Sequence, residues 1–559
     1  YDMLGEAART EGDARRYHLS YSDAITALAG ACKSKDIREN PGISVKLSAL
    51  HPRYEVAQRE RVMSELVARA RSLALLAKSA GMGFNIDAEE ADRLDLSLDV
   101  IAAILSDPAL KGWDGFGVVV QAYGPRASHV ISWLYELAGL LNRRIMVRLV
   151  KGAYWDTEIK RAQTLGLDGF PVFTRKTSTD VSYIACARRL LGMTDRIYPQ
   201  FATHNAHTVA AVLEMAEEGQ AFEFQRLHGM GESLHNVVLS EAGTRCRIYA
   251  PVGAHEDLLA YLVRRLLENG ANSSFVNQIV DETLSPEAIS TDPFSAVEML
   301  GDNQANPNIR QPKALYGAGR VNARGWDLTD LDDLADIEES RSRWENHQWQ
   351  AKPMTVRAAT GGETVEIINP ANHQDIVGHV TTGDAATVAG ALEEARSAMA
   401  GWSSRTPGER GAILNKAADL YEEHAGEMFA LLAREAGKTQ ADCVAEIREA
   451  VDFLRYYAMQ AEALGADRQA RGVFACVSPW NFPLAIFTGQ LSAALAAGNA
   501  VVAKPAEQTP LIASRAVELL HQAGVPAPTL QLIPGDGPTV GAAWRLRSAS
   551  QDSGIGASS

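Results

Sequence analysis

Residues 145–155 have the sequence IMVRLVKGAYW, in which an apolar run containing two cations leads directly into a glycine and two aromatic residues. The run Ile145–Gly152 has the length and the aliphatic content of a buried strand. Helical patterns flank it, and the same alternation of short apolar runs with longer amphipathic stretches continues through the first 300 residues. This regular alternation predicts right-handed crossovers and a parallel sheet.

Outward from this strand, the pattern predicts eight strands, most of them separated by amphipathic stretches such as Arg61–Ala80 and Ser128–Asn142. Eight strand–helix units in roughly 250 residues fit a closed (β/α)8 barrel of the TIM type better than an open sheet. The chain begins inside a predicted strand, so we expect a segment upstream of it. The predicted strands are Tyr1–Glu6, Ile43–Ala49, Gly83–Ala88, Gly117–Ala122, Ile145–Gly152, Tyr198–Thr203, Phe222–Leu227 and Cys246–Ala250.

The pattern changes after the barrel, and we expect four segments in all. They are a barrel at 1–300, a linker at 301–355, a second domain at 356–543 and a disordered tail at 544–559. The linker is rich in Asn and Pro at Asn303–Pro312, and the acidic run Asp327–Glu339 predicts a solvated helix. The tail is rich in Ser, Gly and Ala and has few apolar residues.

The second domain combines strands with long helices. Its predicted strands are Thr364–Asn369, Gly378–Thr382, Cys476–Pro479 and Ala500–Lys504. Its predicted helices are Ala385–Met399, Thr406–Glu422, Glu427–Ala436 and Leu484–Ala497. The last two strands and the helix between them form a βαβ unit, which indicates a Rossmann-like α/β domain.

Composition excludes several classes of protein. A formal net charge of −15 disfavours a nucleic-acid surface, which needs clustered Lys and Arg. The five cysteines form no CxxC pair, which argues against a zinc site or a disulfide framework and favours reduced thiols in the cytoplasm. No apolar run approaches the roughly 20 residues of a spanning helix. The barrel predicted for the first half of the chain is a common enzyme fold, so its polar residues indicate which chemistry it could perform.

Polar residues occur in or just after six of the predicted strands. Because parallel strands of a barrel end at one mouth, these side chains can gather there, where barrel enzymes bind their substrates. A single charged residue could be a core ion pair, but six strands with the same feature favour a site. The residues are Glu6, Lys46, Asp87, Gln121, Arg148 with Lys151, and His204.

Two groups of cations are candidates for anion binding. Arg148 and Lys151 beside Gly152 could stabilise a reduced flavin, although a phosphate site would use the same residue types. Arg264 and Arg265 lie in a predicted helix, Asp257–Asn269, and could bind a substrate carboxylate. From spacing alone, a surface role for this arginine pair is the favoured interpretation.

Six stretches of the first half are very similar to the proline dehydrogenase domain of the bifunctional proline utilization A family. This resemblance covers residues 1–300 and implies oxidation of L-proline to 1-pyrroline-5-carboxylate with FAD. A carboxylate anchor can orient the substrate for hydride transfer to the flavin. The stretches are Tyr1–Ala7, Ser44–Tyr54, Asn85–Glu90, Arg148–Trp155, Ala202–His207 and Tyr261–Gly270.

The resemblance assigns roles residue by residue. Arg264 and Arg265 would bind the proline carboxylate, and the pocket would be shaped by Lys46, Asp87, Tyr154, Leu227 and Tyr249. Arg148 would lie near the reactive nitrogen of the flavin. The other FAD-binding residues would be Gln121, Lys151, Gly152, Ala153, Trp155, His204 and Glu268.

The second domain resembles the glutamate-semialdehyde dehydrogenase of the same family, which belongs to the aldehyde dehydrogenases. The similarity runs from about Thr364 to Val540, with motifs at Ser478–Leu484 and Gly498–Glu507. It implies that Asn481 supplies an oxyanion-hole donor and that Lys504 and Glu507 contact the ribose of NAD.

This second domain departs from its family in one decisive respect. The family uses a nucleophilic cysteine well downstream of the ribose-binding lysine, but no cysteine follows Cys476 here. We therefore expect a truncated NAD-binding domain without catalysis, and a buried structural thiol at Cys476.

Partners and alternatives follow from the same resemblance. The family implies a quinone electron acceptor at a membrane surface, a cytoplasmic protein that is peripheral to the inner membrane, and a homo-oligomer. A folate reductase would also use a barrel-bound FAD, but the arginine pair with Tyr249 favours proline. A DNA-binding regulator is disfavoured by the net charge. A catalytically inactive scaffold remains the alternative for residues 356–543.

Overall fold

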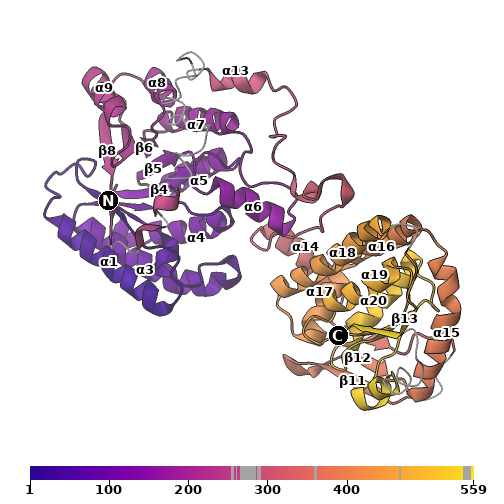
Figure 1. Ribbon diagram of the computed structural model, residues 1–559. Helices are drawn as coiled ribbons and strands as arrows, with labels where there is room; N and C mark the ends of the chain where they lie inside the picture. The colour runs from indigo at the N-terminus through magenta and orange to yellow at the C-terminus, as the bar shows by residue number, and fades with distance from the viewer. Residues whose placement is uncertain are drawn as a thin grey trace. The chain divides into compact units, whose positions relative to one another are not determined.

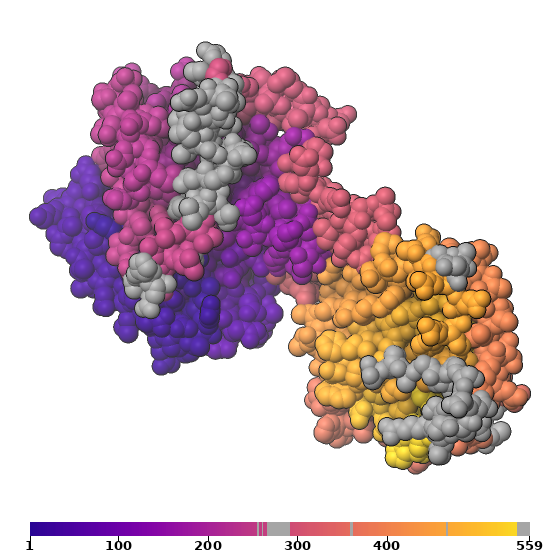
Figure 2. Space-filling model, in the orientation of Figure 1, coloured from indigo at the N-terminus to yellow at the C-terminus, as the bar shows by residue number. Residues whose placement is uncertain are grey.

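The computed structural model describes residues 1–253, 257–259, 261–264, 285, 291–357, 362–464, 468–544 and 555–558. The chain divides into two compact units (Figure 1). The first unit consists of residues 1–162 and 169–309, and the second consists of residues 163–168 and 310–559. The atoms of each unit pack closely in the space-filling view, where the first is indigo to magenta and the second mainly orange to yellow (Figure 2).

The first unit contains a parallel sheet whose strands pair in chain order from β1 to β8, with β9 added beside β1. Strands β8 and β9 are separated by one residue, and β9 pairs with β1 through Asp2 and Pro251. Together β8 and β9 form the eighth side of the barrel, because β8 pairs with β7 and β9 pairs with β1. This closes the barrel and confirms the predicted eightfold architecture. The strands are β1 Asp2–Met3, β2 Gly42–Val45, β3 Gly83–Ile86, β4 Phe116–Gln121, β5 Ile145–Val150, β6 Ile197–Ala202, β7 Glu223–Leu227, β8 Arg245–Tyr249 and β9 Pro251–Val252.

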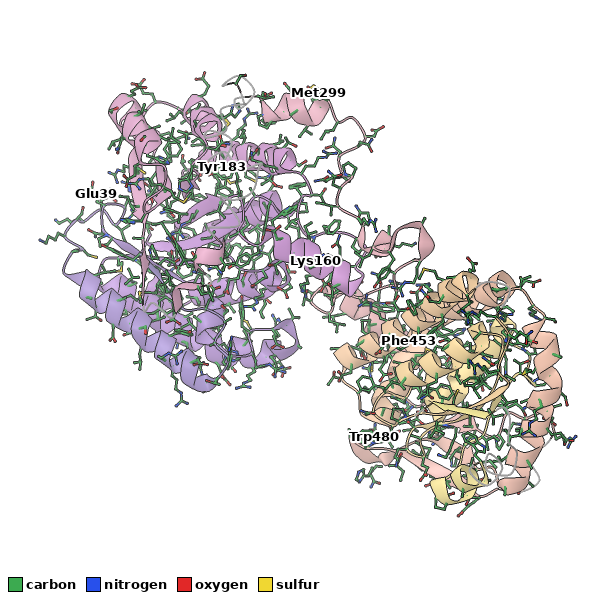
Figure 3. The ribbon with its side chains drawn as sticks, viewed as in Figure 1. Glu39, Lys160, Tyr183, Met299, Phe453 and Trp480 are labelled. Carbon is green, nitrogen blue, oxygen red and sulfur yellow. The ribbon has the colours of Figure 1, made fainter. Side chains whose placement is uncertain are left out.

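Helices surround this sheet and bury its outer face (Figure 1). The first of them begins at a capping box, in which Thr10 and Asp13 bind each other's backbone amides. Tyr183 joins a helix to the barrel, since its hydroxyl donates to the carbonyls of Leu149 and Ala202 (Figure 3). The helices are α1 Glu11–Ala29, α2 Leu47–Leu50, α3 Arg59–Ser79, α4 Leu94–Leu105, α5 Ala127–Leu140, α6 Trp155–Leu165, α7 Lys176–Leu191, α8 Ala206–Met215, α9 Glu232–Ala242 and α13 Pro293–Glu298.

Most of the predicted linker is part of the second unit rather than a free connection. From residue 310 onward the chain packs on the helices of that unit. Ala323, Trp326, Ile337 and Trp349 are buried in its core, because large apolar side chains gain more by burial than by exposure. The predicted acidic helix exists as α14 (Leu331–Ser342), and β10 (Trp349–Ala351) follows it.

The rest of the second unit has two sheets covered by helices. One sheet has the order β10-β12-β11, and the other is parallel with the order β15-β14-β13-β16. The predicted strand at Cys476–Pro479 begins and ends earlier, as β13 Val473–Val477, and Pro479 could not extend its ladder because proline has no backbone N–H. The remaining elements are β11 Thr364–Asn369, β12 Asn372–Thr381, α15 Ala385–Ser403, α16 Pro407–Glu423, α17 Ala425–Ala436, α18 Gln440–Ala463, α19 Ala485–Ala496, β14 Ala500–Lys504, α20 Pro510–Ala523, β15 Leu530–Leu532 and β16 Ile555–Ser558.

The predicted disordered tail differs from the structure at both of its described parts. Trp544 is buried in a small apolar cluster. Strand β16 pairs in parallel with β13, with Ile555 opposite Val473. The reason is that β13 offers unpaired backbone groups on that side, which a further strand can satisfy. Within the described parts of both units, no helix is long and apolar enough to cross a membrane.

Candidate active site

The candidate site lies at the carboxyl ends of the barrel strands. Lys46 directly follows β2, Asp87 follows β3, Arg148 lies near the end of β5, and Tyr249 is the last residue of β8. Because these strands are parallel members of one barrel, their ends meet at the same mouth. The structure thus brings together four of the residues that the sequence predicted for this site.

Asp87 is the centre of a buried hydrogen-bond network. Its Oδ2 accepts from the Lys46 ammonium at 3.1 Å and from the Tyr249 hydroxyl at 2.9 Å. Its Oδ1 accepts from Nη1 of Arg148 at 3.0 Å. Lys46 also donates to Asp2 at 2.9 Å. Two cations and two carboxylates therefore neutralise one another inside the barrel.

The electrostatics of this network favour its ionised form. Burial by itself would raise the pKa of Asp87, but the charges of Lys46 and Arg148 hold it below its usual value. Burial by itself would lower the pKa of Lys46, but Asp2 in particular, together with Tyr249 and Asp87, raises it well above its usual value. The shifts of the two partners agree in direction with an ion pair. The network is therefore a rigid charged floor for the mouth.

Arg264 lies in a second group at this mouth. Its guanidinium forms a bidentate ion pair with the carboxylate of Glu6, with one N–O distance of 2.8 Å. It also lies over the ring of Tyr154, 5.5 Å from the ring centre. A forked cation of this kind can bind a substrate carboxylate if Glu6 yields part of it. Two further predicted residues, Arg265 and Glu268, lie outside the described residues.

Lys151 belongs to a third cluster, beyond the end of β5. Its ammonium and that of Lys176 both bind the carboxylate of Asp180, the second at 2.6 Å. Burial would raise the pKa of Asp180, but the two lysines lower it. Among the described residues, two cations thus share one carboxylate here, an arrangement suited to binding an anionic group.

Gly152 allows the backbone to pass close to an aromatic ring. Its φ is +136°, and a Cβ placed there would lie 2.5 Å from the ring of Tyr123. Only glycine fits such a position, because an L side chain would meet both the strained backbone and the ring. The turn after β5 is therefore fixed by packing, with half-buried Ala153 next along the chain.

The remaining predicted residues of the barrel hold neighbouring loops. The side-chain amide of Gln121 donates to the carbonyl of Glu89 at 2.8 Å, and the indole of Trp155 donates to the carbonyl of Phe173 at 2.8 Å. Nε2 of His204 accepts from the backbone amide of Leu227 at 3.0 Å. These contacts fix the mouth loops.

The sequence missed several groups that complete the site. Asp2, Ser44, Lys176 and Asp180 were not predicted, and Glu6 was noted only as a polar residue near a strand. Ser44 lies in β2, two positions before Lys46, whose backbone directly after the strand is still extended, so the alternation places both side chains on the inner face. That alternation was the signal that could have found Ser44. No comparable signal in the sequence pointed to Asp180 and Lys176, the other members of the cluster of Lys151.

In the second unit, Asn481 lies on the loop between β13 and α19. Its backbone carbonyl accepts from Nζ of Lys438 at 2.6 Å. Glu446 binds the same ammonium at 3.1 Å, and its other oxygen accepts from the amides of Leu484 and Ala485. This arrangement fixes the loop while the Asn481 side chain stays exposed. Nearby Trp480 is also at the surface, 59% exposed (Figure 3).

Lys504 is the last residue of β14, the neighbour of β13, and Glu507 follows that strand. Lys504 is buried and donates to the carbonyl of Pro505 at 3.1 Å, and burial lowers its pKa. Glu507 accepts from the amide of Gly537 at 2.7 Å. In open α/β sheets, ligands bind outside these carboxyl ends of strands. The position of both residues suits a nucleotide.

Cys476 cannot act as a nucleophile in this structure. Its side chain lies in β13 and is 1% exposed. Burial raises the pKa of its thiol to about 12, so the reactive thiolate does not form near neutral pH. This confirms the expectation of a buried structural thiol.

Known proteins match both units. Residues 1–278 match the model of the proline dehydrogenase family, and residues 356–546 match that of the aldehyde dehydrogenase family. The bifunctional protein PutA of Klebsiella aerogenes is 53% identical over 97% of this chain and 42% of its own length. A mutant of Bradyrhizobium japonicum proline utilization A has a TM-score of 0.87 at 50% identity, over 97% of this chain and 54% of that one.

Another solved proline utilization A, with proline bound in remote sites, has the same TM-score of 0.87 and identity of 50%, over 97% of this chain and 54% of that one. The chain spans less than half of the length of the curated PutA relatives that it matches. Within that span both domains align in the same order. The chain therefore belongs to the family of the bifunctional PutA proteins, with a proline dehydrogenase domain at residues 1–278 and residues of the aldehyde dehydrogenase family at 356–546.

Proposed function

We propose that the first unit oxidises L-proline to 1-pyrroline-5-carboxylate with FAD as its cofactor. The observation that carries this proposal is the buried, ion-paired network of Lys46, Asp87, Arg148 and Tyr249 at the mouth of a barrel that matches the proline dehydrogenase family. Oxidation of a secondary amine depends mainly on orientation over the acceptor, and a rigid charged floor provides orientation.

The substrate is held by its carboxylate and by apolar contacts. Arg264, with Arg265 beside it in the sequence, binds the carboxylate of the substrate. On binding, this carboxylate displaces Glu6 from the guanidinium of Arg264. Tyr154 and Leu227 pack against the ring of the substrate. A small amino acid with a ring and one carboxylate fits this combination of a forked cation and aromatic walls.

The residues of the mouth fit FAD. When bound, FAD supplies the acceptor of the hydride. Lys151 and Lys176 place positive charge where the diphosphate would lie, and Gly152 lets the backbone approach it closely. Arg148, held by Asp87, would bind the flavin and stabilise the negative charge that its ring gains on reduction. The other residues of this binding set are Gln121, Ala153, Trp155, His204 and Glu268.

The second unit retains the positions for NAD but performs no oxidation in this chain. Lys504 and Glu507 would contact the ribose of NAD, and Asn481 would stabilise an oxyanion. An oxyanion donor needs a nucleophile to create the charge that it stabilises, and the chain has no cysteine after buried Cys476. Residues 356–543 thus supply no nucleophile of their own for this step.

The family also leads us to propose the partners of the first reaction. A quinone at a membrane surface would take the electrons from the reduced flavin, and the protein would be cytoplasmic and peripheral to the inner membrane. Homo-oligomers are expected for the same reason. None of these partners involves nucleic acid, in keeping with a formal net charge of −15.

An absorption spectrum of the purified protein tests the main proposal. We expect the bands of oxidised FAD, and we expect L-proline added under argon to bleach them. Addition of D-proline serves as the control for a chiral site. A colourless protein that cannot be reconstituted with FAD would contradict the proposal.

A second measurement tests whether the first unit alone is catalytic in this chain. Proline is supplied with an artificial electron acceptor and NAD together. We expect pyrroline-5-carboxylate to accumulate, trapped as its o-aminobenzaldehyde adduct, with no absorbance of NADH. Formation of NADH that depends on pyrroline-5-carboxylate would mean that the second unit is catalytic after all.

A further inference from the structure

The interior of the barrel below the mouth is polar. Ser44, Asn85, Arg148 and Gln200 are at most 6% exposed, although branched apolar residues usually fill the layers of such a barrel. The strand pairing places Ser44 opposite Asn85, and Arg148 opposite Gln200. A polar layer in this position must satisfy its hydrogen bonds within the barrel.

A small cavity lies inside this layer, with a volume of about 20 Å³. It is lined by residues of strands β2, β3, β5, β6 and β8, which surround the barrel axis, so the cavity lies in the barrel interior. One water molecule needs at least about 10–15 Å³ by this measure. The lining residues used below are Ser44, Gly83, Asn85, Met146, Arg148 and Gln200.

Three buried polar atoms on the cavity residues have no hydrogen-bond partner among the described residues. They are Nε of Arg148, Oε1 of Gln200 and Oδ1 of Asn85. The first is a donor and the other two are acceptors. A single water molecule matches this set, because its oxygen accepts one bond and its two hydrogens donate one bond each.

The orientation of the Gln200 amide is fixed by its other end. Its Nε2 donates to Oε1 of Glu223 at 2.9 Å, and the guanidinium of Arg247 binds the same carboxylate at 2.8 Å. A flipped amide would place its oxygen against that carboxylate and is therefore disfavoured. Oε1 of Gln200 is thus directed away from Glu223.

We propose that one structural water occupies this cavity, accepts from Nε of Arg148 and donates to Gln200 and Asn85. Arg148 then has a partner on every side: Asp87 and Ser44 bind its two terminal nitrogens at 3.0 Å each, and the water binds Nε. Gln200 acts through this water as a positioning residue for Arg148. This role rests on the proposed flavin function, whereas the water site does not.

Gly83 offers a way to displace the water without touching Arg148. A Cβ built there meets its nearest neighbours at 3.8–3.9 Å, one of them Sδ of Met146, so alanine fits without strain. Because Gly83 lines the cavity, its added methyl takes the space that the water needs. Gly30→Ala is the matched control, since nothing lies within 4 Å of a Cβ there.

Crystal structures of the unmodified protein and of Gly83→Ala test the water site directly. We expect density for a water within about 3.2 Å of Arg148 Nε in the first and its loss in the second. A well-ordered structure with a dry cavity would overturn the proposal. This readout is independent of flavin content, so it stands even if the proposed activity fails.

Kinetics test the positioning role. We expect Gly83→Ala and Gln200→Leu to lower kcat for proline about threefold to tenfold while KM changes less than about twofold, because one hydrogen bond to a charged group is lost. Gly30→Ala should leave both unchanged. Equal kcat values in all four proteins, with water present in the unmodified one, would refute the role of Gln200 and leave only the water site.

Discussion

Buried carboxylates have different partners in the two units. In the barrel, Asp87 is 8% exposed, and its partners among the described residues are all side chains: two cations and a phenol. In the second unit, Glu435 is 3% exposed, and its carboxylate is bound, within the described part of the chain, by the backbone amides of Leu511 and Ile512 at the start of α20. The first carboxylate organises charged side chains at a mouth, and the second satisfies the free amides of a helix terminus.

The type of partner distinguishes a buried carboxylate in a binding site from one that only supports the fold. Side-chain partners can exchange for a ligand, so a network such as that of Asp87 can bind and orient a substrate. The carboxylate of Glu435 instead binds the amides of Leu511 and Ile512 in the buried first turn of α20, which is a structural role. Both carboxylates are buried, so the kind of partner, and not burial alone, distinguishes a binding network from a structural contact.

Replacing Asp87 should produce the largest effect. We expect Asp87→Ala to reduce the free energy of unfolding of the barrel by about 3–5 kcal/mol, because it leaves Lys46 and Arg148 buried with fewer partners. Proline oxidation should fall by at least about 100-fold as these groups lose their positions. Denaturant unfolding and flavin bleaching by proline measure the two effects.

The control for that variant is Asp95→Ala. Asp95 binds Arg126 at 3.0 Å, but both side chains are nearly half exposed. We expect a loss of no more than about 1 kcal/mol and unchanged oxidation, as for other exposed ion pairs. Equal losses in both variants would mean that burial does not distinguish the network of Asp87.

Replacing Arg264 should have a smaller and more specific effect. We expect Arg264→Met to weaken proline binding by more than about tenfold, since a charged hydrogen bond to a buried carboxylate contributes about 2–5 kcal/mol. FAD binding should be largely retained. Proline titrations of the flavin spectrum measure both, and Arg15→Met, whose side chain is 75% exposed, is the control. Unchanged proline dependence would return Arg264 to a structural role with Glu6.

The sequence predicted the barrel because each strand and helix is signalled locally. Apolar runs located strands β1 to β8, and amphipathic patterns located helices such as α3 and α5 within a few residues, whereas the two-residue strand β9 was not predicted. Lys46, Asp87 and Arg148 were predicted as neighbours because parallel strands end together. Local pattern and topology were sufficient for these features.

Other features depend on partners that are distant in sequence. The pairing of Arg264 with Glu6 joins residues separated by 258 positions, and no local signal predicts it. The packing of Trp326 and Trp349 into the second unit likewise depends on helices far along the chain. The acidic and Asn-rich composition of this region suggested a solvated linker. Composition does not show which side of a helix is covered by the rest of the fold, so the buried face was missed.

The smallest predicted effect concerns pH and tests the architectural role of Glu435. Burial raises the pKa of this carboxyl from 4.5 to about 8, against the lowering effect of its two amide donors. The folded state therefore binds the proton more tightly than the unfolded state, and stability must decrease as the pH rises from about 4.5 to about 8. We expect a loss of about 1–3 kcal/mol across that range, seen as lower hydrogen-exchange protection factors in α20 after correction for the intrinsic rise of exchange rates with pH. Glu435→Gln should remove most of this pH dependence, because glutamine does not ionise, whereas Glu338→Gln, at a side chain that is 62% exposed, should retain it. An unchanged pH dependence in Glu435→Gln would show that the amides of α20 hold the carboxylate ionised throughout this pH range. Glu435 and Asp87 would then differ in their partners alone, and not in the effect of burial on the pKa of the carboxyl.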